Sequence, residues 1–159
     1  MKKLTTLLIA LFILNIAGRA QDLNKFFKKY ASDDRFESIS VGKTLIKFAS
    51  IFSDVNPDDF QIFSKMKQIK VLKITEQENN EAIFQSFQKD MEKLTKCDCF
   101  DTLATTRTKN KSTNIISRTA KDNNTDVLII SNDKKTLSII WLNGKISKEE
   151  LERIVNEDD

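Results

Sequence analysis

Two cysteines separated by one aspartate, Cys97-Asp98-Cys99, are the residues of this sequence best suited to chemistry. In an extended strand, side chains i and i+2 point the same way, but their Cβ atoms lie farther apart than the roughly 3.8 Å that a disulfide needs. In a loop the two sulfurs can approach and bond. Two hypotheses therefore stand: a structural role as a local disulfide or half-buried thiols, and a redox pair that exchanges with other thiols.

The charges expected around the pair favour the structural hypothesis. Reactive thiols usually lie at a helix N-terminus or beside a basic residue, either of which stabilises the thiolate. Here a helix is expected to end just before Cys97, and the negative end of its dipole disfavours a thiolate. Lys96 is a basic neighbour in the sequence, and Asp98 opposes it.

Other catalytic and metal-binding arrangements lack the residues they need. The chain has no histidine, so a serine–histidine–aspartate triad is excluded, and its two cysteines are short of the four ligands of a structural zinc site. Gly42 and Gly144 are the glycines after residue 20, too few for a glycine-rich phosphate loop. Carboxylate pairs fall in an expected loop and in the first turns of two expected helices (Asp33-Asp34, Asp58-Asp59, Glu149-Glu150). We expect no catalytic residue, no metal and no cofactor, and hence a protein that is not an enzyme.

Residues 1–20 have the three parts of a secretory signal peptide. A basic start at Lys2 and Lys3 precedes 13 uncharged residues, Leu4–Ile16, and the small residues Gly18 and Ala20 suit a signal peptidase. The apolar run is shorter than the about 20 residues that span a bilayer. No cysteine directly follows it to carry a lipid. We expect cleavage after residue 20, export to the periplasm or the medium, no membrane span after cleavage, and no lipoprotein.

Cleavage would also remove the positive net charge. The chain has 26 Lys and Arg residues against 23 Asp and Glu, and residues 1–20 hold three basic residues and no acidic one. The remainder, residues 21–159, is therefore neutral, whereas nucleic-acid-binding proteins usually present a basic face to phosphates. Its length suits a single domain, and we expect no nucleic-acid partner.

Apolar spacing and capping residues predict the helices. Apolar residues recur at i, i+3, i+4 and i+7 over Leu23–Tyr30 and over Leu45–Phe52. Asn56-Pro57-Asp58-Asp59 is typical of a helix start, and that helix would bury Phe60, Phe63 and Met66.

Capping boxes predict two more helices, each pairing a hydroxyl residue with a glutamate three positions on. The pair Thr75 and Glu78 would open a long helix running past Leu94. The pair Ser147 and Glu150 would open a last helix near the C-terminus.

The remaining segments predict strands. Glu37–Val41 alternates in polarity, and the apolar run Ile69–Ile74 is typical of a central strand. From Phe100 onward a period of two predicts four strands separated by polar tips, with Asn143-Gly144 as the turn after the last (Phe100–Thr108, Ser112–Ala120, Asp126–Asn132, Thr136–Leu142). The fold predicted is α+β: a mostly antiparallel sheet of about six strands that ends in a four-strand meander, with helices packed on one face.

Three stretches resemble a family of small exported Bacteroidota proteins known only as a domain of unknown function. They are the Phe26–Tyr30 helix after the signal, the strand Ile69–Leu72 before a long phenylalanine-bearing helix, and the strand Leu137–Leu142 followed by Asn-Gly-Lys-Ile and a Glu-Glu-Leu helix. The resemblance covers nearly the whole chain but includes no catalytic motif. It implies that many relatives carry other residues at Cys97-Asp98-Cys99, and it brings no known activity.

Apolar residues on both faces of one strand indicate a binding surface. In the run Ile139-Ile140-Trp141-Leu142, one face should meet the helices, and the other would be exposed or covered by a partner. We mark Ile140, Trp141 and Leu142 as a candidate apolar binding face. The 11 phenylalanines of the chain are expected mainly in the core.

Asp101-Thr102-Leu103 matches a short motif that Bacteroidota use for O-glycosylation of exported proteins. Thr102 is therefore a candidate glycosylation site, although a position within a strand would reduce its accessibility.

These observations favour a non-catalytic protein of the cell envelope that binds another envelope protein or an apolar ligand, through the sheet face or a helix–sheet groove. The alternative is a periplasmic thiol redox protein that works through Cys97 and Cys99.

Overall fold

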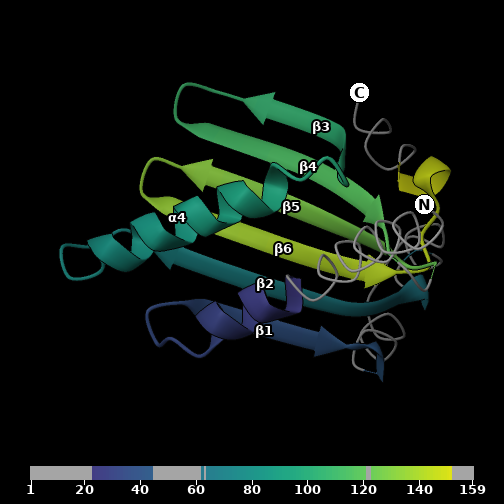
Figure 1. The fold of residues 1–159 in the computed structure, drawn as a ribbon, viewed down its shortest axis with the longest axis horizontal. Coiled ribbons are helices and arrows are strands. Elements are labelled where there is room, and N and C mark those ends of the chain that lie inside the picture. The colour runs from purple at the N-terminus through teal and green to yellow at the C-terminus, as the bar shows by residue number, and fades with distance from the viewer. Residues whose placement is uncertain (1–22, 45–61, 63, 121–122, 152–159) are drawn as a thin grey trace, which may run out of the picture.

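A computed structural model describes residues 23–44, 62, 64–120 and 123–151. Six antiparallel strands form one sheet in the spatial order β1-β2-β6-β5-β4-β3 (Figure 1). Their bounds are β1 Glu37–Gly42, β2 Met66–Thr75, β3 Asp101–Arg107, β4 Lys111–Thr119, β5 Thr125–Asp133 and β6 Thr136–Gly144. The predicted α+β class and the four-strand meander, β3 to β6, are confirmed.

Hydrogen-bonded partners far apart in the sequence join the two halves of the sheet. β2 pairs with β6 over nearly its whole length, so that Leu72 lies opposite Ile139 and Ile74 opposite Leu137. These four side chains are almost completely buried, which fixes the register, because a slip by one residue would expose all of them.

Two of the described helices cover one face of the sheet. The N-terminal helix, residues 23–31, lies near β1 and β2, and α4 (Glu81–Thr95) crosses the central strands (Figure 1). Tyr30 from the first helix, Phe87 from α4 and Phe36 from the loop before β1 pack in tilted and edge-to-face contacts at centroid distances of 4.8–5.1 Å. All the described phenylalanines are buried or partly buried, as expected for core residues.

The opposite face of the sheet carries a second, smaller cluster. Met66, Val127, Ile146 and Leu151 are buried there. The predicted last helix is present as far as it is described, through Leu151, and its capping box is formed. The backbone N–H of Ser147 donates to Glu150 Oε2 over 2.9 Å, and the backbone N–H of Glu150 donates to Ser147 Oγ over 3.2 Å.

The predicted capping box at Thr75 and Glu78 is wrong. Thr75 is the last residue of β2, and its hydroxyl forms a hydrogen bond with that of Thr136 in β6. The hydroxyl that was expected to cap the helix is therefore used between two strands. α4 begins at Glu81 after Asn80, whose side chain instead accepts from the N–H of Gln77 and donates to the Thr75 carbonyl.

Two smaller expectations also differ from the structure. Met66 begins β2 and does not end a helix, and Asn143-Gly144 closes β6 and is not a turn. Gly144 is required by close approach, because a Cβ there would lie 2.6 Å from the Lys65 carbonyl oxygen. The predicted helices over Leu45–Phe52 and after Asn56, and the signal peptide, fall mainly or wholly outside the described residues.

Candidate functional site

The loop between α4 and β3 holds a disulfide between Cys97 and Cys99. The helix ends at Thr95 with Lys96 as its cap, and β3 starts at Asp101, so both cysteines are outside regular structure, where neighbouring sulfurs can meet. Both side chains are partly buried, and Cys97 Sγ accepts a hydrogen bond from the Cys99 backbone N–H over 3.4 Å.

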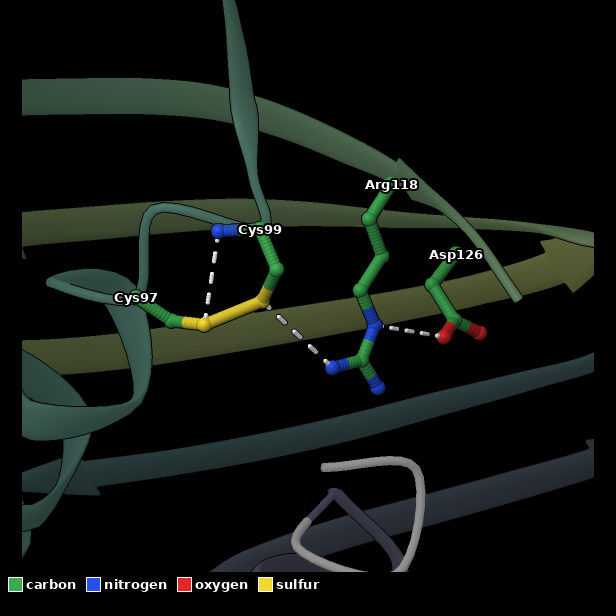
Figure 2. Close-up of a disulfide and its surroundings, with 4 residues drawn as sticks. All are labelled: Cys97, Cys99, Arg118 and Asp126. Carbon is green, nitrogen blue, oxygen red and sulfur yellow. Dashed lines mark hydrogen bonds and ion pairs between the residues drawn. A yellow bond between two sulfur atoms is a disulfide. The ribbon is translucent and has the colours of Figure 1, made fainter. Parts of the chain in front are cut away.

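Beneath this loop lies a buried ion pair between neighbouring strands. Arg118 in β4 and Asp126 in β5 are directly opposite each other, and Arg118 Nε donates to Asp126 Oδ2 over 3.0 Å (Figure 2). Their side chains are only 8% and 4% exposed. The other oxygen of Asp126 accepts from Trp141 Nε1 over 2.8 Å and from Asn143 Nδ2 over 2.7 Å. The carboxylate is thus held by three donors in a place nearly closed to water.

The guanidinium of Arg118 connects the ion pair to the disulfide. Its Nη1 points at Cys99 Sγ from 4.0 Å, while its Nε faces Asp126 (Figure 2). The ring of Phe100 lies 4.8 Å from the guanidinium carbon. A cation therefore lies beside one of the two sulfurs. The sequence-based prediction considered only Lys96 and Asp98 and missed this cation.

A groove of about 330 Å³ lies on the same side of the sheet, between α4 and the outer strands. In this part of the sheet, β4 presents Ser112 and Asn114, and β5 presents Asn132, where the central strands present apolar side chains. This part of the face is therefore polar. Most of the lining is amide and hydroxyl, with one carboxylate and an apolar floor (Gln88, Met91, Glu92, Thr95, Thr102, Ser112, Asn114, Ile116, Ile130, Asn132). Such a surface can hold a ligand through hydrogen bonds.

The candidate glycosylation residue Thr102 is exposed and lines this groove. It lies on β3, the strand at the edge of the described sheet, where the pairing with β4 shifts between Thr102 and Ala104. The position in a strand therefore does not bury the hydroxyl.

The three residues of the candidate apolar face do not share a face. Trp141 points toward the helices and is 3% exposed, packed against Phe27 and bonded to Asp126. Ile140 and Leu142 point to the opposite side of the sheet and are partly buried. Leu142 packs against the second cluster, together with Ile69.

Two of the expected carboxylate pairs can be described, and in each of them the pKa of one carboxyl is lowered. Hydrogen bonds from Arg35 lower the pKa of Asp33 to about 2. Hydrogen bonds at the start of the last helix lower the pKa of Glu149. A general acid needs the opposite shift. The pair Asp58-Asp59 lies outside the described residues.

Within the described part of the chain, no three acidic, cysteine or histidine side chains come together to hold a metal ion. None of the helices described there is long and apolar enough to cross a membrane.

Comparison with known proteins assigns the family. The chain belongs to the family described as "Domain of unknown function (DUF4252)", whose model matches residues 30–154 of the 159. No curated protein and no solved structure matches the chain.

Proposed function

We propose that this member of the DUF4252 family is an exported protein of the Bacteroidota cell envelope that binds a partner and catalyses no reaction. Export is supported by the tripartite pattern of residues 1–20, and the absence of histidine from the chain supports a non-catalytic role. The observation that carries the binding role is the helix–sheet groove between α4 and the outer strands.

The lining of the groove favours a peptide segment of another envelope protein over an apolar ligand. The side chains of Gln88, Asn114 and Asn132 each offer a donor and an acceptor, which match the backbone groups of an extended peptide. An apolar ligand would cover these groups without pairing them, which costs free energy. Met91 and Ile130 in the floor supply apolar contact below them.

A photo-crosslinking residue placed in the groove tests this proposal in the native host. Asn114 is exposed on the groove side of β4, and Thr106 is exposed on the other side of the sheet, opposite Thr113. We expect a reproducible crosslinked protein from position 114 and none from position 106. Equal crosslinking from both positions, or none from 114, would contradict binding in the groove.

Glycosylation at Thr102 is a side proposal that rests on the Asp101-Thr102-Leu103 motif and on the exposure of the hydroxyl. A glycan there would stand at the edge of the groove. Glycopeptide mapping of protein from the native host that finds residue 102 unmodified would remove it.

Thiol–disulfide exchange through Cys97 and Cys99 is a second candidate function, favoured by the guanidinium of Arg118 beside Cys99. A cationic neighbour is one of the features that activate cysteines. If this is the function, Cys97→Ser should abolish it while the domain stays folded. Unchanged behaviour of that variant in the host would exclude it.

A further inference from the structure

We propose that Arg118 makes the disulfide chemically unequal, so that an attacking thiol bonds to Cys97 and Cys99 leaves as the thiolate. The inference deepens the second candidate function and rests on it for its biological meaning, but its chemistry can be tested by itself.

The contacts of the two sulfurs carry the inference. Cys99 Sγ faces a cationic N–H of Arg118 at 4.0 Å, whereas Cys97 Sγ accepts a hydrogen bond from the neutral backbone N–H of Cys99 at 3.4 Å. In thiol–disulfide exchange the sulfur whose thiolate is more stable leaves faster. A full positive charge stabilises a thiolate more than a neutral N–H dipole does.

Asp126 opposes this effect only in part. Its carboxylate lies on the Nε side of the guanidinium, and its oxygens are held by Arg118, Trp141 and Asn143. The Nη1 group is turned to the sulfur (Figure 2). Because both charged side chains are nearly closed to water, the field of Arg118 at Cys99 is weakly screened.

The charged residues of the loop itself and its ends are exposed to solvent. Lys96 lies at the end of α4, 4.0 Å from Glu92, and its side chain is 78% exposed. Asp98 and Asp101 are exposed as well. Screening by water and salt weakens these charges, so the buried guanidinium decides which sulfur leaves.

The reaction balances with a dithiol reductant as the partner class. A thiolate of the reductant bonds to Cys97 Sγ, the bond between Cys97 and Cys99 breaks, and its electron pair remains on Cys99 Sγ. The second thiolate of the reductant then attacks the reductant sulfur that is bonded to Cys97. This attack releases Cys97 as a thiolate. The protein disulfide has gained two electrons, the reductant has become a disulfide, and solvent exchanges the protons.

Two single-cysteine variants test the inequality without touching Arg118. Cys97→Ser leaves Cys99 alone, and Cys99→Ser leaves Cys97 alone. Iodoacetamide alkylation is timed at pH 6.5, where few thiols are ionised, and at pH 10, where nearly all are. Dividing the first rate by the second removes differences in access. We expect the normalised rate of Cys99 to exceed that of Cys97 roughly threefold to tenfold, the range for a thiolate stabilised by about half a pKa unit to one pKa unit.

Equal normalised rates, or a faster Cys97, would overturn the inference. In the Cys97→Ser background, the further pair Arg118→Met and Asp126→Asn removes both buried charges together, and the advantage of Cys99 should then disappear. A fast Cys99 in a protein whose Cys97→Ser variant behaves normally in the host would instead reject the redox function and leave the chemical inequality standing.

Discussion

The substitution Asp126→Asn gives the sharpest test of the packing beneath the disulfide. It removes the negative charge from a site where the carboxylate accepts hydrogen bonds from Arg118, Trp141 and Asn143. An asparagine oxygen can still accept from the indole and the amide. The Arg118 charge, however, would remain in a place where its side chain is 8% exposed, with no opposite charge from residue 126.

The expected loss follows from removing the carboxylate that pairs with the buried Arg118 charge. Breaking a buried ion pair by removing one partner typically costs about 3–5 kcal/mol, a large share of the roughly 5–15 kcal/mol that stabilise a typical domain. With a urea dependence of about 2 kcal/mol/M, a loss of about 4 kcal/mol lowers the unfolding midpoint by about 2 M. Urea unfolding followed by circular dichroism measures it.

A matched control separates burial from charge. Asp101 lies 3.8 Å from Lys148, and both side chains are more than half exposed, so Asp101→Asn removes an ion pair that water already screens. We expect no measurable shift of the urea midpoint for this variant. The double variant Asp126→Asn with Arg118→Met should be more stable than Asp126→Asn alone, because it removes both charges of the buried pair together. A loss below about 1 kcal/mol for Asp126→Asn would refute the argument that the pair is sealed from water.

Three further results are expected. Reducing the disulfide should cost the domain at most about 1.6 kcal/mol, the chain-entropy value for its three-residue loop, as measured by urea unfolding with and without reductant. Gly144→Ala should destabilise by about 1–3 kcal/mol because its methyl group would meet the Lys65 carbonyl, whereas at Gly42 a methyl group has open space and the same change should have little effect. The pKa of Asp90 is lowered, chiefly by the hydrogen bond from Lys29. The ionised Asp90 carboxylate therefore stabilises the fold above the usual carboxyl pKa, and this contribution is lost as the pH falls through the lowered pKa. Asp90→Asn should flatten this acid limb of the curve of unfolding free energy against pH.

Sequence periodicity predicted the meander within about two residues at each end, because polar tips and a period of two mark strands wherever one face is buried. Capping boxes were less reliable. Ser147 and Glu150 form theirs, but the hydroxyl of Thr75 is taken by a cross-strand partner, which a local pattern cannot reveal. The pairing of β2 with β6 depends on packing across the whole sheet and was not predictable from spacing.

The sequence contains a pattern that predicts the buried pair of Arg118 and Asp126. Arg118 follows the buried Ile116 by two residues, and Asp126 precedes the buried Leu128 by two, so strand alternation places both charges on the core face. Opposite charges at core positions of adjacent strands indicate a buried pair. Their contact with Cys99, in contrast, depends on how the loop after α4 folds back over β4, which no spacing rule gives.

The groove and the disulfide both lie at the connection between α4 and β3. The two candidate functions can therefore be distinguished in a single protein. Thr95 lines the groove from the last turn of α4, Thr102 lines it from β3, and the disulfide lies in the chain between them. A partner that uses the groove alone should crosslink at Asn114 equally with and without reductant, since the disulfide closes a loop of three residues and constrains little beyond it. A partner that is itself a dithiol should be lost when Cys97 and Cys99 are both replaced by serine, whatever the state of the groove. Crosslinking that falls on reduction but survives the double replacement would fit neither function.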